Sequence, residues 1–306
     1  METEWVNSFK TIIYESIKSL PDEVSLSFSG GIDSSMILFT MIDLGKPPKE
    51  LITFEIEGEP SKDLEYAKKI AQHYGLPLKV AKVPSSPSRD DLLGEVKEII
   101  KTTRTTRNIE TQVCYAYSYM IPLITTGHLV TGFYEDIMFA TNANISSKYS
   151  KHLKGLMSKE DFDGEYKLIR KQVFEGKYKS GAEHNYLVII RYLEAKGIKV
   201  ECPYNTDCMF NLFQSLTFKQ TNYNPNTGKK HKKWFITEET HKDFFALFNN
   251  HKNINNMHTT GKDGGLKGLH RRVLLTGTSF KDTRAIYNEV LKEIEFEEKA
   301  MFNVKP

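Results

Sequence analysis

Leu26-Ser27-Phe28-Ser29-Gly30-Gly31-Ile32-Asp33-Ser34-Ser35 is the stretch of this sequence that decides the fold. It joins an apolar run over residues 24–28, which predicts a buried strand, to an apolar helical pattern over residues 36–44. In an open parallel sheet, ligands collect at the carboxyl ends of strands, where the next helix presents unpaired backbone N–H groups and a partial positive charge. The loop over residues 29–34 therefore predicts an anion site.

The residue types in this loop suit a phosphate group. Gly30 and Gly31 allow the backbone to approach an anion closely, and Ser29 and Ser34 add hydroxyl donors. Asp33 would be repelled by phosphate unless a cation such as Mg²⁺ lay between the two charges, so the loop also predicts a metal. Two glycines after a strand often form only a tight turn, but the order of strand, loop and apolar helix favours a phosphate site. The loop lacks the Gly-Lys-Ser/Thr ending of a Walker-type loop and the glycine spacing of the dinucleotide fingerprint.

The rest of the first half continues this alternation of helix and strand. An amphipathic helix over residues 5–20 precedes the first strand, and Pro47-Pro48 separates the loop's helix from a strand over residues 51–54. Further elements are expected as a helix over 64–74, a strand over 78–83, helices over 92–100 and 113–123, and a strand over 128–131. Alternating strands and helices imply an α/β fold with a parallel sheet and flanking helices.

The second half has a different pattern. From about residue 136 it is mostly helical, with one plausible short strand over residues 198–200, and residues 146–154 are polar, basic and expected to be mobile. We therefore predict a nucleotide-binding α/β core over residues 1–150 and a mostly helical region over residues 151–306 that completes the site.

Composition narrows the class of protein only a little. The chain has 306 residues, and 42 Lys and Arg against 39 Asp and Glu give a formal charge of +3, so no global charge excess demands nucleic acid or a membrane surface. No apolar run is long enough to span a membrane. The first residues lack the pattern of a secretory signal, and three cysteines fit a reducing compartment. We expect a soluble cytoplasmic protein.

The decisive stretch resembles the PP-loop of ATP pyrophosphatases, particularly the synthetase domain of asparagine synthetase. This resemblance implies an adenine nucleotide alpha hydrolase-like fold and the cofactors ATP and Mg²⁺. Four segments carry it beyond the loop: Thr53-Phe54-Glu55-Ile56, Ser61-Lys62-Asp63-Leu64-Glu65-Tyr66-Ala67, Val130-Thr131-Gly132-Phe133-Tyr134-Glu135-Asp136 and Val200-Glu201-Cys202-Pro203-Tyr204.

The resemblance also implies roles for particular residues. Asp33 and Asp136 would hold Mg²⁺ on the ATP phosphates, and two acids from different strand ends suit a hard cation. An ordinary acid at a helix N-terminus is the structural alternative for Asp136. The nucleotide would contact Leu26, Ser27, Ser29, Gly30, Gly31, Asp33, Ser34, Ile56, Thr131 and Gly132.

A late lysine in this family neutralises charge that develops on phosphorus. Lys262, in a glycine-rich loop, aligns best, and Lys267 is the second choice. The basic run over residues 229–233 would grip phosphates or an acidic partner, although such runs are usually solvated loops.

The chain departs from the family pattern in two places. Phe133 stands where asparagine synthetase has Glu and related β-lactam synthetases have Tyr, so Tyr134 or Glu135 would act as the catalytic base. The sequence also has Glu2 where the family's glutaminase domain has its cysteine nucleophile, and it reaches its PP-loop by residue 29. We therefore expect no ammonia from glutamine by that route.

The leading interpretation is an AMP-forming C–N ligase. It would adenylate a small-molecule carboxylate, release pyrophosphate and form an amide with an amine or with ammonia, which a separate protein would supply if it is not free. One alternative is a PP-loop enzyme that modifies RNA or a nucleobase, with Cys202 and Cys208 carrying sulfur. Another is a non-catalytic ATP or AMP sensor, because Phe133 cannot accept a proton at the position where the family has Glu or Tyr.

Overall fold

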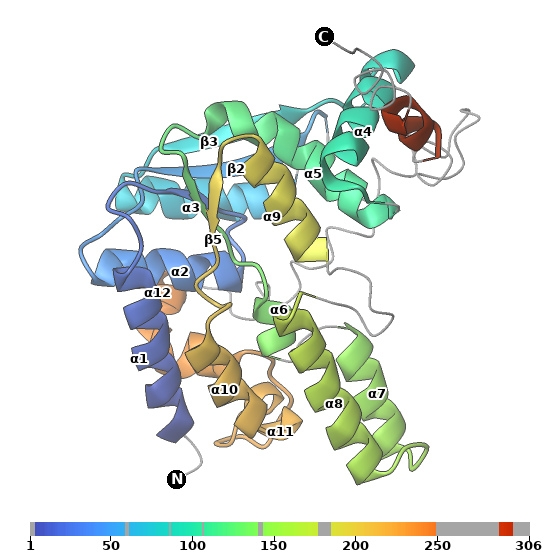
Figure 1. Cartoon of the computed structure of the whole chain (residues 1–306). Helices are drawn as coiled ribbons and strands as arrows, with labels where there is room; N and C mark the ends of the chain where they lie inside the picture. The colour runs from blue at the N-terminus through green and yellow to red at the C-terminus, as the bar shows by residue number, and fades with distance from the viewer. Residues whose placement is uncertain are drawn as a thin grey trace.

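The centre of the molecule is a parallel five-stranded sheet in the order β3-β2-β1-β4-β5 (Figure 1). A computed structural model of the chain describes residues 4–58, 61–85, 87–105, 107–139, 143–176, 185–248 and 288–295. The strands are β1 (Ser25–Ser27), β2 (Glu50–Ile56), β3 (Leu78–Val83), β4 (His128–Val130) and β5 (Lys199–Glu201). The parallel α/β fold and each predicted strand are confirmed.

Helices cover both faces of this sheet. On one face α2 (Ile32–Asp43) and α3 (Lys62–Tyr74) pack on the strands, and on the other lie α4 (Arg89–Thr103), α5 (Asn108–Met120) and α9 (Asn185–Ala195). Neighbouring residues of a strand point to opposite faces. Leu51 therefore joins the core under α2 and α3, whereas Ile52 joins the core under α4, α5 and α9, and both side chains are fully buried.

The remaining elements are mostly helical, as predicted for the second half. They are α1 (Glu4–Lys18), η1 (Ile121–Leu123), α6 (Glu135–Met138), α7 (Ala143–Leu153), α8 (Lys159–Phe174), α10 (Asp207–Ser215), α11 (Phe218–Asn222), the π-helix η2 (Phe235–Thr240) and α12 (Lys242–Leu247), with a further helical segment over residues 288–295. Figure 1 shows α7 and α8 as a hairpin that projects away from the sheet. Among the helices in the described ranges, none has the length and apolar character needed to cross a membrane.

The strand order reverses at the middle of the sheet, which is where a doubly wound sheet is expected to form its crevice. The chain runs from β1 outward to β2 and β3, and then returns to the other side of β1 for β4 and β5. Ligands bind where strand order reverses in this way, outside the carboxyl ends of the two central strands. Leu26 of β1 pairs with Val130 of β4, so the loops that follow these strands leave the sheet side by side. These are the loops that carry Asp33 and Asp136.

A cluster of aromatic rings holds the start of η2, and Trp234 just before it, against the N-terminal helix α1. Trp5 and Phe9 of α1 meet Phe235 with ring centroids 4.9 and 5.0 Å apart, and Phe9 meets Phe213 of α10 at 5.8 Å. All four side chains are buried. Trp234 is also buried, and its indole N–H donates to the Gln220 carbonyl oxygen at 2.9 Å. The backbone at residues 234–235 is therefore held on both sides.

The prediction of a mobile segment over residues 146–154 is wrong, because most of it belongs to α7. Ile145 and Tyr149 lie one turn apart on this helix and are both buried. The Tyr149 ring packs on Phe218 with centroids 4.1 Å apart and on Phe162 at 5.3 Å. These two buried residues thus hold a helix whose sequence is mostly polar. The division at residue 150 stays a prediction, although β5 from the second half pairs with β4.

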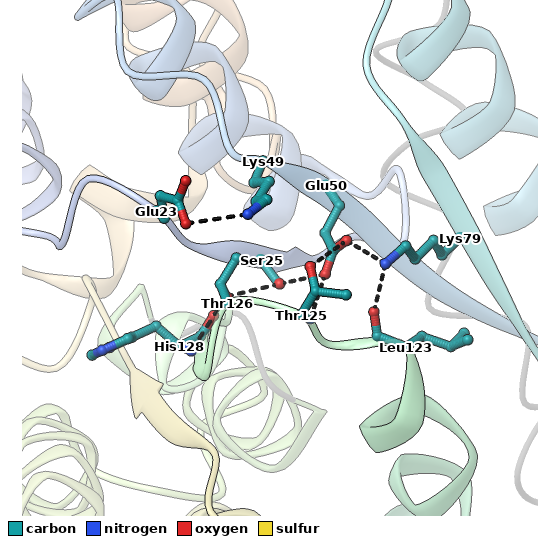
Figure 2. A network of polar contacts seen from close by, with 9 residues as sticks. All are labelled: Glu23, Ser25, Lys49, Glu50, Lys79, Leu123, Thr125, Thr126 and His128. Carbon is teal, nitrogen blue, oxygen red and sulfur yellow. Dashed lines mark hydrogen bonds and ion pairs between the residues drawn. The ribbon is translucent and has the colours of Figure 1, made fainter.

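At the amino ends of the strands, opposite the loops of the crevice, a polar network centres on Glu50 (Figure 2). Glu50 accepts hydrogen bonds from the Ser25 hydroxyl at 2.8 Å and from the Thr125 backbone N–H at 2.8 Å, and Lys79 lies 2.5 Å away. Burial raises the pKa of Glu50, but these donors outweigh burial, so its pKa is lowered. One buried carboxylate therefore ties together β1, β2, β3 and the turn before β4.

Replacing Glu50 with Ala should lower the free energy of unfolding by about 2–3 kcal/mol, because buried donors lose their acceptor. Glu23→Ala is the matched control at the same end of the sheet: Glu23 is 70% exposed and pairs with Lys49 at 3.1 Å, apart from the contacts of Glu50. That exposed pair contributes about 0–1 kcal/mol. Urea unfolding of both variants checks the difference, and equal losses would contradict the central place of Glu50.

Candidate active site

The PP-loop lies at the carboxyl end of β1 and runs directly into α2, as predicted. Gly31 is the N-cap of α2, and the first backbone bond of the helix runs from Ser35 N–H to the Gly31 carbonyl oxygen at 2.9 Å. The N–H groups of residues 32–34 come before that bond and have no acceptor within the helix. They add to the positive end of the helix dipole, so the loop offers an anion both donors and charge.

Two hydroxyl groups flank this helix start. Ser29 Oγ and Ser34 Oγ lie 3.3 Å apart, and Ser29 Oγ accepts from the Gly31 N–H at 3.2 Å. Ser29 is exposed, whereas Ser34 is buried, so the pair lines the loop from its rim to its base. Both hydroxyls lie where a phosphate at the helix start would accept hydrogen bonds.

Gly30 brings the PP-loop into contact with α3. Its φ of +72° lies in the left-handed region that glycine adopts readily. A Cβ at this position would lie 2.8 Å from the backbone nitrogen of Ala67 and 2.9 Å from the Tyr66 Cβ. Only glycine fits this approach, and the contact lies within residues 61–67, one of the segments that carry the family resemblance.

The loop after β4 supplies the facing wall. A Cβ on Gly132 would lie 3.5 Å from the Asp33 Cβ, so this loop passes directly over the start of α2. Tyr134 has a φ of +74° and is the N-cap of the short helix α6, which begins with Glu135 and Asp136. The turn therefore directs two acids toward the PP-loop.

The carboxylates of both loops converge on the ammonium group of Lys233. Its Nζ lies 2.8 Å from each carboxylate oxygen of Asp33, 2.7 Å from Glu135 Oε2 and 3.2 Å from Asp136 Oδ1. The Lys233 and Glu135 side chains are 4% and 5% exposed, whereas those of Asp33 and Asp136 are 16% and 26% exposed. We call these four residues the carboxylate–lysine cluster.

Charge controls proton binding in this cluster. Burial would lower the pKa of Lys233, but the charges of Asp136, Asp33 and Glu135 outweigh it and hold the pKa well above its ordinary value. Burial, followed by the charges of Asp136 and Asp33, raises the pKa of Glu135 well above that of an exposed glutamate. The lysine is therefore a charged ammonium, and Glu135 keeps a proton more readily than an exposed glutamate does.

The donor set of the cluster fits a magnesium ion. Three carboxylates surround one positive charge, so negative charge exceeds positive charge when all are ionised, and carboxylate oxygens are the ligands that Mg²⁺ takes. Glu135 Oε2 is buried and pairs with the Lys233 ammonium at 2.7 Å. In the described part of the chain, no three His, Cys, Asp or Glu side chains already stand in a metal-holding arrangement. Asp33 and Asp136 share Lys233 instead.

Tyr204 supports the cluster from the loop after β5. Its hydroxyl donates to the Asp33 carbonyl oxygen at 2.9 Å, and its side chain is fully buried. Burial and the nearby charges of Asp33 and Glu135 raise its pKa well above the ordinary value, so it stays a neutral donor. It therefore orients the first turn of α2, which carries Asp33.

The expected nucleotide-contacting residues divide into two groups. In the loops, Ser29 is exposed and Ser27, Gly31, Asp33 and Gly132 are partly exposed, whereas Gly30, Ser34 and Thr131 are buried. Leu26 is fully buried and Ile56 is 5% exposed, so both contribute to the core beneath the crevice. Ser27 Oγ lies 3.4 Å from the Tyr117 hydroxyl, and Thr131 Oγ1 lies 3.5 Å from Cys202 Sγ. Their contacts with a nucleotide stay predictions.

The predicted late lysine, Lys262, and its alternative Lys267 lie outside the described residues. The lysine that the structure brings to the site is Lys233, which ends the basic run over residues 229–233. The expectation that this run is a solvated loop is wrong for Lys233, because its neighbours Trp234 and Phe235 are buried and draw it inward. In the sequence, the change from basic to apolar residues after Lys233 was the one sign that this end of the run is buried.

Phe133 packs among aromatic rings beside the cluster. It stacks on Tyr186 with centroids 4.9 Å apart and an interplanar angle of 14°, and it meets Tyr117 edge-on at 6.1 Å. Burial raises the pKa of Tyr134, which disfavours the phenolate that a tyrosine base requires. Of the two predicted bases, Glu135 is the one whose carboxylate lies in the carboxylate–lysine cluster, and its role as a base stays a prediction.

The first strand of the parallel sheet runs through a Ser-Gly-Gly loop into a helix N-terminus, which is the arrangement expected of a PP-loop. Residues 21–120, about a third of the chain, match the family model described as asparagine synthase. This match confirms the resemblance for the segment that contains the PP-loop. No curated protein matches the chain.

Two solved structures are also similar to this chain. One is described as a predicted subunit of tRNA methyltransferase from Methanocaldococcus jannaschii; it is 18% identical over 60% of this chain and 90% of that chain, with a TM-score of 0.25. The other is U34-tRNA thiolase NcsA from Methanococcus maripaludis with its 4Fe–4S cluster, 16% identical over 92% of this chain and 87% of that chain, with a TM-score of 0.33. At these values neither likeness says what this protein acts on.

Proposed function

We propose that this protein is an AMP-forming ligase that adenylates a carboxylate with MgATP and transfers the acyl group to ammonia or an amine. The observation that carries the proposal is the convergence of Asp33 from the PP-loop and Asp136 from the facing loop on one point. The asparagine synthase match over residues 21–120 supports the use of ATP.

The chain's residues would divide the work of the first step. The N–H groups at the start of α2, with Ser29 and Ser34, would bind the β- and γ-phosphates. Asp33 and Asp136 would hold Mg²⁺, which when bound neutralises charge on the phosphate oxygens. A substrate carboxylate oxygen would attack the α-phosphorus, and the bond from this phosphorus to the bridging oxygen of the β-phosphate would break. Pyrophosphate would leave against the loop, where a positive helix end stabilises it.

The second step requires a proton acceptor. The nitrogen of ammonia or an amine would attack the acyl carbon, and the carbon–oxygen bond to AMP would break. The nitrogen loses a proton in forming the amide, and Glu135, when ionised, would take it up because burial and the charges of Asp136 and Asp33 raise its pKa well above that of an exposed glutamate. Lys233 would remain near the leaving groups and contribute a positive charge.

A pyrophosphate-release screen tests the proposal. Pools of amino acids, other carboxylic acids and nucleosides would be incubated with MgATP and ammonia, and the products of active pools would be identified by mass spectrometry. An acid-dependent release of pyrophosphate with formation of an amide is the expected result. Release that depends on a nucleoside or RNA and on no carboxylic acid would instead support the base-modifying alternative.

The sulfur-transfer form of that alternative depends on Cys202, which lies beside the site. Burial raises the pKa of Cys202 to about 12, which disfavours the thiolate that sulfur transfer uses. We therefore expect the Cys202→Ser/Cys208→Ser double variant to keep pyrophosphate release within about threefold of the wild-type rate, because thiols take no part in the proposed steps. Loss of activity in the double variant, with an unchanged melting temperature, would favour sulfur transfer.

A further inference from the structure

The ammonium of Lys233 stands at the point where Asp33 and Asp136 converge, although these are the proposed Mg²⁺ ligands. We propose that Lys233 is a built-in counter-cation, which holds the carboxylate–lysine cluster together before MgATP binds and leaves this position when the metal arrives. The inference rests on the proposed function for the assignment of the two metal ligands.

The distances show that the Lys233 ammonium and Mg²⁺ cannot occupy this position together. Lys233 Nζ lies 2.8 Å from both carboxylate oxygens of Asp33 and 3.2 Å from Asp136 Oδ1. Mg²⁺ binds carboxylate oxygens at about 2.0–2.1 Å. An ion bound to the same oxygens would therefore lie against the ammonium, and charges of +2 and +1 at such a separation repel strongly. Either the lysine moves or the metal does not bind.

The cluster needs a cation when no metal is present. Three acids lie together, and Glu135 is nearly fully buried, so their mutual repulsion is only weakly screened by water. Lys233 is the cation that the structure places among them, with one ion pair to each acid. The ammonium thus keeps the two loops in the arrangement that a metal would require.

The lysine is anchored at its backbone and free to change its side-chain torsions. Its φ of +60° is a left-handed conformation that non-glycine residues rarely adopt, and the buried Trp234 and Phe235 hold the next two positions. Its four-carbon side chain has several rotatable bonds. When Mg²⁺ binds Asp33 and Asp136, the ammonium stays near the PP-loop, where phosphate oxygens would accept its hydrogen bonds.

Binding of Mn²⁺ without nucleotide, measured by the loss of the free-ion signal in electron paramagnetic resonance, tests this inference. Lys233→Met removes the competing charge and should bind Mn²⁺ at least roughly tenfold more tightly than the wild type. Its melting temperature should also rise with Mn²⁺ by more than that of the wild type. Lys79→Met is the matched control, because it removes an ion pair with a single buried acid, Glu50, at the opposite edge of the sheet. It should bind Mn²⁺ like the wild type.

Equal or weaker Mn²⁺ binding by Lys233→Met would overturn the inference. Folding of this variant only with divalent metal would support it. If the variant fails to fold under both conditions, the wild-type protein with ¹³Cε-labelled lysine decides, with the resonance of Lys233 assigned by its absence in Lys233→Arg. That resonance should shift when Mg²⁺ and a non-hydrolysable ATP analogue are added, and an unchanged resonance would overturn the inference. None of these measurements needs turnover, so their outcome is independent of whether an acyl-adenylate forms.

Discussion

Replacing Asp33 with Asn should abolish ATP/pyrophosphate exchange and leave the fold intact. Asparagine has nearly the same shape as aspartate but carries no charge, so it would remove one of the two acids proposed to hold Mg²⁺. We expect the rate of exchange to fall by about a thousandfold or more, which is typical when an enzyme loses a group that stabilises charge in the transition state. The measurement is incorporation of labelled pyrophosphate into ATP with an active acid.

The cluster explains why stability should survive this change. Lys233 also pairs with Glu135 and Asp136, so it keeps two carboxylate partners when Asp33 is neutral. Asp43→Asn is the matched control, since it makes the same substitution at the last residue of the same helix. There, Asp43 accepts a hydrogen bond from the Tyr14 hydroxyl. This control should retain full exchange. Substantial exchange by Asp33→Asn would show that Asp33 does not hold the metal.

Replacing Gly30 with Ala should both destabilise the protein and eliminate nucleotide binding. The new methyl group would lie 2.8 Å from the Ala67 backbone nitrogen, which belongs to the middle of α3 and cannot move alone. The positive φ adds about 1 kcal/mol of backbone strain. We expect a total loss of about 2–4 kcal/mol in the free energy of unfolding, because α3 or the PP-loop must shift.

Gly45→Ala separates the two contributions. Gly45 also has a positive φ, +66°, but an added Cβ there has no atom within 4 Å among the described residues. It should therefore lose only about 1 kcal/mol, the cost of the backbone conformation. Urea unfolding and titration with a fluorescent ATP analogue measure both effects. Nucleotide binding by Gly30→Ala at wild-type affinity would contradict the close fit of the PP-loop against α3.

The strands, the helices around them and the PP-loop could be predicted because their signals are local. The apolar run before residues 29–34, the glycines and the helix after them are adjacent in the sequence, and this order suffices to place the loop at a strand end. Asp136 follows the strand expected over residues 128–131, and the structure brings it to the same edge as Asp33. In each case the sequence predicted the strand, and the geometry of a parallel sheet then predicted at which edge the following loop lies.

Lys233 could not be assigned by such signals. It lies 200 positions after Asp33 in the chain, and its ion pairs depend on how η2 packs against α1. A run of lysines by itself indicates a solvated surface, and the aromatic contacts of Trp5 and Phe9 that draw this segment inward come from the opposite end of the sequence. The helix α7 was missed for a related reason, because its two buried residues pack on α8 and α11.

The most direct test of adenylation by this site is ³¹P nuclear magnetic resonance of ATP incubated with the protein, Mg²⁺, ammonia and an acid pool from the screen. The account predicts resonances of AMP and pyrophosphate in equal amounts, growing together only when the acid is present and absent for Asp33→Asn. Formation of ADP and orthophosphate by the wild-type protein would contradict it, since cleavage would then occur at the γ-phosphorus and no substrate would be adenylated.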